Sequence, residues 1–403
     1  MANAAPDVCG LLSLPVEMNM NVFSFALLNS GKDVLNLAMS CKAMYNILMN
    51  NQPSILLAFL SQMDPRELAI ATAHYHATIA PWRCPEDLDM PVPQDQTDYL
   101  HKITDFCEQY LSKQGTELRI PFHRFTFPMV AHIQDIHLII RRIAATLAPL
   151  VMDDRERWPI PAPSSAEMAK ISKALYLIDL VRLLFSKSPV TLVQHMDSDI
   201  SRRDHAFTKF WSCFAPWESY QVELMTGVII NYAIKRLEYG ERFGLSRRRD
   251  RIRFVLWKGM KGLDPLIHYG PSEDGKRLRR LIREDPRFKA IRRMPAQCPA
   301  YWFDGPGIHD VSIDPKVIER YDSDIDGASV RVWLCNCCLG LPINGKAPFG
   351  NPLAWEIEPQ NSYMFFDMDH LFETCKGRLP SLVDLLKLTE QKIFIMRPFW
   401  EWE

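Results

Sequence analysis

The residues from 14 to 48 constrain the fold more than any other stretch of this chain, because they hold three short helical patterns in direct succession. Pro15 suits the first position of a helix, and Glu17 then lies beside the free N–H groups of the first turn. Asp33 is expected to cap a second helix, and a third lies around Lys42–Met49. Such helices bury one small core, so their other apolar residues either pack on the rest of the chain or bind a partner.

The order of residue types in this stretch resembles the F-box, a motif that opens with Leu-Pro-x-Glu and closes with Cys-Lys or Cys-Arg, an aromatic residue and a leucine. Met18 stands where the family usually has Ile or Leu, Val34 stands for a Leu, and Tyr45 stands for the more common Trp or Phe. These are exchanges among apolar side chains, which a small core tolerates. The positions that match the motif are Leu14, Pro15, Glu17, Met18, Val22, Leu37, Cys41, Lys42, Tyr45 and Leu48.

The resemblance implies a substrate receptor of a cullin–RING ubiquitin ligase of the SCF type. In that family the motif binds a Skp-type adaptor, which links the receptor to a cullin scaffold, and the rest of the chain holds the protein target. The motif positions named above are therefore the expected adaptor-binding residues. Ubiquitin transfer belongs to the partners, so neither enzyme activity nor a cofactor is expected of this chain. A scaffold that binds the adaptor but sends no target to degradation has the same motif, and the sequence does not separate the two.

The patterns along the chain predict a mainly α fold with three parts. These are an F-box of three helices at residues 1–60, a helical target-recognition region at 61–295, and a smaller mixed α/β region at 296–403. The hydrophobic content of 47% and the charged content of 24% are those of globular domains with a sizeable core. No repeat of roughly 20–50 residues is found, so a leucine-rich-repeat or propeller domain is not expected.

Cysteine usage and hydropathy predict a protein of the cytoplasm or the nucleus. The N-terminal residues lack the basic and apolar segments of a signal peptide, and no apolar run reaches the length of a transmembrane helix. The ten cysteines form no even framework in this long chain, so we expect free thiols in a reducing compartment. The net charge of −1 indicates neither nucleic acid nor membrane as a partner of the whole chain.

Helical periodicity continues through the middle region, broken by two proline-rich loops at 81–96 and 158–165. Asp64 and Pro65 are a typical opening of one of these helices. A block that includes Pro216–Ile229 resembles uncharacterised fungal F-box-like proteins. The expected helices are 54–61, 64–80, 98–113, 127–150, 166–186 and two within 204–239.

The C-terminal region is predicted to be mixed, because the character of the sequence changes at about Pro295. β-Branched and aromatic residues among Gly, Pro, Asn and Asp turns favour short strands at Val330–Cys335 and Tyr363–Asp367. One more helix is expected at Ser381–Thr389, followed by an aromatic tail.

The strongest charge feature is the segment Lys235–Arg293, which holds nineteen Lys and Arg residues against eight Asp and Glu residues. Such a basic block can follow nucleic-acid phosphates, so a nucleic-acid-associated protein is the alternative to a ligase receptor. The block can equally bind an acidic or phosphorylated protein, or form a solvated helix face with internal ion pairs. The residues that would contact an anion are Arg247, Arg248, Arg249, Arg251, Arg253, Lys276, Arg277, Arg279 and Arg280.

Three clustered cysteines, Cys335, Cys337 and Cys338, are the nearest approach to a metal site in the sequence. They lack the second pair of Cys or His ligands that common zinc fingers have, so no metal is expected. A zinc site here would need further ligands from the set His309, His370 and Cys375.

The histidines of the middle region lie in apolar helical settings and do not share a helix face. They are expected to be hydrogen-bonded core or surface residues rather than ligands or bases. No P-loop, G-x-S-x-G or dinucleotide-binding pattern occurs, so no catalytic residue is predicted. The histidines in question are His74, His76, His132 and His137.

Overall fold

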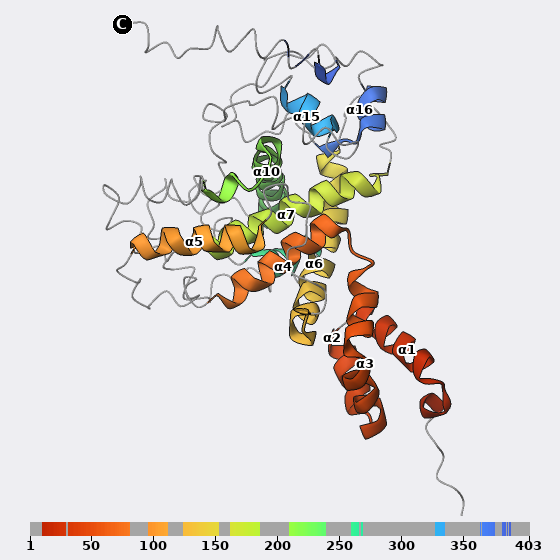
Figure 1. Ribbon diagram of the computed structural model, residues 1–403. Helices are drawn as coiled ribbons and strands as arrows, with labels where there is room; N and C mark the ends of the chain where they lie inside the picture. The colour runs from red at the N-terminus through yellow and green to blue at the C-terminus, as the bar shows by residue number, and fades with distance from the viewer. Residues whose placement is uncertain are drawn as a thin grey trace, which may run out of the picture.

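The computed structural model describes residues 10–29, 31–80, 96–111, 124–152, 162–185, 209–238, 259–265, 267–268, 327–334, 363, 365–374, 381–383, 385 and 387. These residues are mainly α-helical, as predicted, and no β-strand occurs among them. Figure 1 shows that helices α1–α3 project from one end of a larger helical body, while the short helices α15 and α16 lie at the opposite end of that body.

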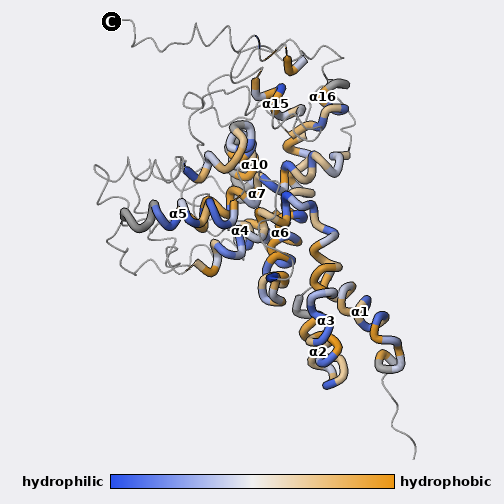
Figure 2. The backbone as a smooth tube through the Cα atoms, in the orientation of Figure 1, coloured by the Kyte–Doolittle hydropathy of each residue, from blue (hydrophilic) through white to orange (hydrophobic). Residues whose placement is uncertain are grey.

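The projecting part consists of a short 3-10 helix, η1 (Gly10–Ser13), followed by α1 (Val16–Asn29), α2 (Gly31–Met39) and α3 (Lys42–Leu60). Hydrophobic and hydrophilic residues alternate along these helices (Figure 2), as expected where one face of each helix points inward. Asp33 lies within the first turn of α2, so its predicted capping position is wrong. The inward faces form a small core of Phe23, Leu27, Val34, Ala38, Met44 and Leu48.

Helix α3 is longer than predicted, because it continues through Pro53 to the end of the predicted separate helix at 54–61. The prediction of a break was therefore wrong. Proline removes one N–H donor from the helical ladder, and the cost of this loss depends on what replaces the donor. The side chain of Pro53 is exposed, so water can reach the carbonyl oxygen that the missing N–H would have bound. The result is one continuous helix of 19 residues.

The projecting part packs on the body where α2 meets α6 (Phe127–Val151). Gly31, the first residue of α2, is buried, and a Cβ atom added to it would lie 2.8 Å from the Cβ atom of Ala131 on α6. Two methyl groups cannot approach so closely, so the close contact of the two helices depends on the missing side chain at Gly31.

The larger body contains α4 (Pro65–Ile79), α5 (Gln96–Tyr110), α6, α7 (Ser165–Phe185) and α10 (Pro216–Glu238). These helices lie where periodicity predicts them, with ends that differ by a few residues. Asp64 caps α4 as predicted, since its side chain accepts hydrogen bonds from two backbone N–H groups of the first turn at 2.8 and 3.3 Å.

Helix α7 is the centre of this body. It packs against α4 on one side and against α6 and α10 on others. Every residue from 170 to 181 is buried, including polar ones, so the helix is covered on all sides. A helix surrounded in this way shows no clear polar stripe. The polar residues inside it therefore need partners from neighbouring helices, and these partners shape the sites described below.

The described C-terminal residues include α15 (Gly327–Trp333) and α16 (Met368–Thr374). Residues 382, 383, 385 and 387 are also helical, as predicted for this segment. The strand predicted at Val330–Cys335 is wrong, because its residues up to 334 are helical. The strand predicted at Tyr363–Asp367 is also absent from its described residues, which are 3-10 or irregular. β-Branched side chains indicate packing on a buried surface more than a backbone state, and α15 is buried on nearly every side. The sequence of α15 therefore shows no clear helical period.

Buried polar side chains join α16 to the start of α7. Glu167 Oε2 completes a capping box at the beginning of α7. Its other oxygen, Oε1, accepts a hydrogen bond from the backbone N–H of Asp367 at 3.0 Å and lies 3.0 Å from Nδ1 of His370. One turn further along α7, Lys170 donates to the carbonyl oxygen of Phe366 at 2.6 Å. These bonds attach a segment two hundred positions away in sequence to the central helix.

Candidate adaptor-binding surface

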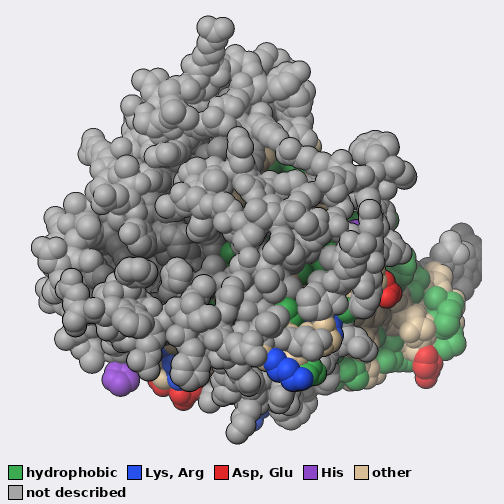
Figure 3. Space-filling view, turned by 90° about the horizontal axis from the view of Figure 1, so that it is seen from above, with side chains coloured by type: hydrophobic (Ala, Val, Ile, Leu, Met, Phe, Trp, Pro, Cys, Tyr) green, Lys and Arg blue, Asp and Glu red, His purple; other side chains and the backbone are tan. Residues whose placement is uncertain are grey.

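The outward faces of the projecting helices carry large apolar side chains that the small core does not cover. Among the motif residues, Leu14 is 36% exposed, Met18 50% and Tyr45 46%. Figure 3 shows hydrophobic side chains gathered with carboxylates at the end of the molecule where α1 projects. Each of these side chains is already about half buried, so covering the rest contributes roughly 1 kcal/mol per side chain before ordering costs. Several of them together suit a protein partner. The other exposed motif residues are Pro15, Glu17 and Lys42.

The remaining motif residues lie deeper. Val22, Leu37 and Cys41 are partly buried, and the last two pack against the core. Leu48 is only 4% exposed and belongs to the core itself. Leu48 therefore supports the surface from beneath and is a core residue rather than a contact.

The same helices expose apolar side chains that the motif does not include. Leu35 and Met39 lie one turn apart on α2, and Met49 lies one turn beyond the motif tyrosine on α3. Periodicity shows which residues share a helix face, but it does not show which face stays outside when three helices pack together. The sequence pattern therefore did not identify these residues as part of the exposed surface. The additional exposed residues are Val16, Phe25, Leu35, Met39, Met49 and Leu57.

A buried amide positions the Leu-Pro segment at the start of α1. The Nδ2 atom of Asn19 donates hydrogen bonds to the carbonyl oxygens of Leu14 at 3.1 Å and Pro15 at 3.3 Å. Asn19 is itself buried, so these bonds are shielded from water and hold the backbone that carries the Leu14 side chain. The sequence gives no signal for this role, because an asparagine inside a helix normally points to solvent.

Several predicted features lie outside the described residues. They include the basic residues from Arg247 to Arg280, and Cys335, Cys337 and Cys338. Within the described part of the basic block, Asp264 forms an ion pair with Arg142 of α6 at 2.8 Å. This pair joins an acidic residue of the block to an arginine outside it, and it involves none of the basic residues predicted to contact an anion.

The histidines of α4 and α6, which share no helix face, meet between the helices. His74 Nδ1 lies 3.2 Å from His132 Nε2, and His74 Nε2 lies 2.8 Å from Asp179 Oδ2 on α7. Asp179 Oδ1 accepts from Arg182 Nε at 2.7 Å and from the backbone N–H of Met260 at 3.2 Å. Burial alone would raise the pKa of Asp179, but the Arg182 guanidinium and His74 hold it well below its usual range.

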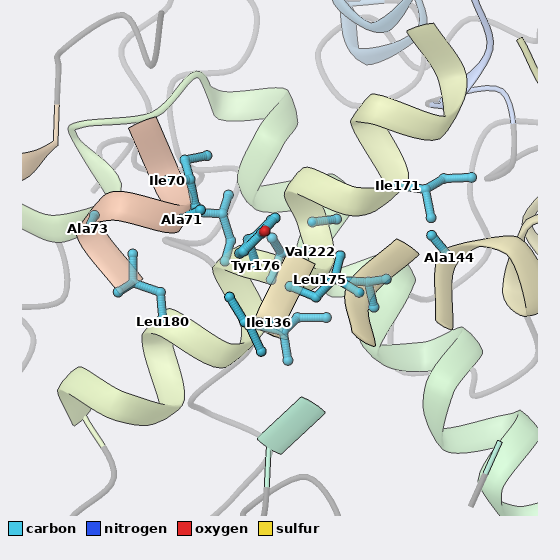
Figure 4. Packing of buried hydrophobic residues seen from close by; sticks show 14 of the residues in the cluster. Ile70, Ala71, Ala73, Ile136, Ala144, Ile171, Leu175, Tyr176, Leu180 and Val222 are labelled. Carbon is cyan, nitrogen blue, oxygen red and sulfur yellow. The ribbon is translucent and has the colours of Figure 1, made fainter. Parts of the chain in front are cut away.

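Apolar side chains pack closely around this network. Figure 4 shows Tyr176 and Leu175 of α7 near Ile136 of α6 and Ile70 of α4. The Tyr176 hydroxyl lies 3.2 Å from Nδ1 of His137, so this buried phenol also has a partner from a neighbouring helix. Burial raises the pKa of Tyr176 well above its ordinary value.

The two remaining histidines are partly buried and packed against aromatic rings or charges. His76 stacks on Tyr110 of α5 with ring centroids 4.1 Å apart, and burial lowers the pKa of His76. Burial, together with the nearby charge of Arg141, lowers the pKa of His137 to about 4. Both residues are therefore neutral packing groups at pH 7. His137 is hydrogen-bonded as expected, whereas Nε2 of His76 is buried without a hydrogen-bond partner among the described residues.

Glu67 is a buried carboxyl group on α4 without a close cation. Its Oε1 atom lies 3.9 Å from Arg141 Nη1, which is too far for a hydrogen bond. Burial raises the pKa of Glu67 to about 7, against the opposing charge of Arg141. The side chain is thus about half protonated at neutral pH.

Comparison of the chain with protein families, with curated proteins and with solved structures found no match. The resemblance to the F-box therefore rests on the motif residues themselves. Among the described side chains, no group of three or more His, Cys, Asp and Glu residues is arranged to hold a metal ion. The described helices include none of the length and apolarity needed to cross a lipid bilayer.

Proposed function

We propose that this chain is the substrate-receptor subunit of an SCF-type ubiquitin ligase. The projecting helices bind a Skp-type adaptor, and residues beyond 60 hold a protein target. One observation supports the proposal most: Leu14, Met18 and Tyr45 are motif residues and are also large apolar side chains that the core leaves exposed. An ordinary helical subdomain would turn such residues toward the body.

The position of this surface also suits an adaptor. The helices that carry it project from one end of the body (Figure 1), so a partner can cover them without displacing α4, α7 or α10. The chemistry of this chain is then recognition, and ubiquitin transfer belongs to the other subunits. We expect such a receptor in the cytoplasm or the nucleus.

The test is retention of the full-length chain by an immobilised Skp-type adaptor, with a double variant, Met18→Glu and Tyr45→Glu. Both side chains are about half exposed, so the fold should persist, and circular dichroism checks this. Two carboxylates placed in an apolar interface should lower adaptor affinity at least about a hundredfold, since each buried unpaired charge costs several kcal/mol.

The matched control is Ile79→Glu, because Ile79 is an equally exposed apolar residue, at the end of α4. This variant should bind the adaptor like the unmodified chain. If the double variant is retained as well as the control, the proposed binding surface is wrong.

A further inference from the structure

The hydrogen bonds among His74, His132 and Asp179 run in a fixed direction. The buried carboxylate of Asp179 is paired with Arg182 and can only accept hydrogen bonds. His74 Nε2 must therefore carry a proton, and in the neutral ring the lone pair of His74 is then on Nδ1. Because this Nδ1 atom accepts, His132 Nε2 must donate. The carboxylate of Asp179 thus determines the tautomer of both histidine rings.

The last atom in this series of hydrogen bonds is Nδ1 of His132. His132 is only partly buried as a residue, whereas His74 and Asp179 are buried. No hydrogen-bond partner of this Nδ1 atom is found among the residues that the structure describes. Burial is the main cause that lowers the pKa of His132 to about 4, and the nearby charge of Lys261 acts in the same direction. The lone pair on Nδ1 is therefore unprotonated at neutral pH.

Lys261 supplies a cation in the neighbourhood of His132. Lys261 is exposed, and its charge is near enough to act on His132. It belongs to a short helix whose start is attached to Asp179 through the backbone N–H of Met260, at 3.2 Å. Gly259, with φ of 71°, permits this approach, since a side chain there would collide with Asp179. One carboxylate thus positions both the base His74 and the segment that carries the cation.

We propose that His132 is a phosphoryl-accepting site, in which Nδ1 is the nucleophile, His74 is the base and Lys261 binds the phosphoryl oxygens. The arrangement has the order of a catalytic triad: a nucleophile within reach of a base, and a base oriented by a third group. The neutral nucleophile beside a cation favours an anionic electrophile over a neutral acyl group.

The reaction requires a phosphoryl donor with a good leaving group. A bond forms between His132 Nδ1 and phosphorus, and the bond from phosphorus to the leaving group breaks, with the electron pair staying on the leaving group. The proton on His132 Nε2 passes to Nδ1 of His74. Asp179 stabilises the resulting His74 imidazolium, which later returns its proton to water. The product is a phosphohistidine on the surface of the body.

The first experiment uses the unmodified full-length chain with phosphoramidate as the phosphoryl donor at pH 7.5, and maps phosphohistidine by mass spectrometry under alkaline conditions. His101 is the internal reference, because it is an exposed histidine on α5. We expect phosphorylation of His132 at least about tenfold faster than that of His101, since base-assisted attack is typically worth more than this. Equal or faster phosphorylation of His101 would overturn the proposal.

Two variants separate a reactive site from a structural network. Lys261→Gln changes an exposed residue, so the fold should persist, and the rate at His132 should fall about tenfold while the rate at His101 stays the same. His74→Gln should reduce the rate at His132 further. If Lys261→Gln leaves the rate at His132 unchanged, the assignment of this site is wrong, whatever the stability of the His74 variant.

Discussion

Two buried carboxyl groups among the described residues, Asp179 and Glu67, differ in how closely they are held by polar partners. Asp179 has three hydrogen-bond donors around it, and its carboxylate stays charged. Glu67 has one cation at 3.9 Å, and its pKa rises to about 7 because burial dominates. The charged form of Glu67 therefore destabilises the folded state above pH 7, where an unfolded chain would ionise this group without cost.

Glu67→Gln should consequently stabilise the protein at pH 8 by about 1–3 kcal/mol and change little at pH 4.5. The upper limit follows from a pKa raised from 4.5 to about 7, at roughly 1.4 kcal/mol per unit, less the lost attraction to Arg141. Urea unfolding at the two pH values measures this difference. Glu17→Gln, at an exposed position of α1, serves as the control and should have no such effect. A destabilising Glu67→Gln at pH 8 would show that the carboxylate has a stabilising partner.

Among the helices, the contact of α2 with α6 joins the proposed adaptor-binding part to the proposed target-binding body. Its closeness depends on Gly31, whose missing side chain leaves room for Ala131. A receptor that presents a target to a ligase needs such a fixed joint, because a mobile connection would leave the target at varying distances from the catalytic subunits.

Gly31→Ala tests this joint. The added methyl group overlaps Ala131, so the helices must separate or shift, and we expect a loss of about 1–3 kcal/mol of stability with a lower Tm. Gly10→Ala is the matched control, since a Cβ atom there meets nothing within 4 Å. Equal melting temperatures for the two variants would contradict a tight contact between α2 and α6.

For the molecule as a whole, two histidines and one glutamate give opposite pH dependences. Burial lowers the pKa of His132 and of His137 to about 4, below the ordinary value of 6.5. As the pH falls from 6.5 to 4, these two histidines therefore become protonated in the unfolded chain before they do so in the folded chain. This difference lowers the free energy of unfolding by up to about 3 kcal/mol per histidine. Glu67 acts in the opposite sense, because its folded form binds a proton first between pH 7 and 4.5.

Taken alone, these three groups predict a net loss of up to about 3 kcal/mol of unfolding free energy between pH 7 and pH 4. Guanidinium unfolding across this range measures the loss. The Glu67→Gln variant lacks the opposing group and should lose about twice as much over the same range. Stability that stays constant or rises toward pH 4 would contradict the neutral, buried state of the two histidines.

The helical class and most helix positions could be predicted from sequence, because periodicity and local caps such as Asp64 are local signals. Features that depend on neighbours in space could not. The prediction of a strand at Val330–Cys335 was wrong because its residues up to 334 are helical. Burial on nearly all sides of this helix hides the helical period in the sequence. Asn19, Gly31 and the pairing of His74 with His132 all involve partners from other turns or helices. Periodicity also could not show that Leu48 faces inward while Tyr45 faces outward.

The most direct test of the central claim is hydrogen–deuterium exchange of the full-length chain with and without a recombinant Skp-type adaptor. The account predicts a stable complex in which amide exchange slows in η1, in the first turns of α1 and in α3 around Tyr45, while the amides of α4, α7 and α10 are unchanged. No complex, or protection confined to the body with the projecting helices unaffected, would contradict the assignment of this chain as an adaptor-binding receptor.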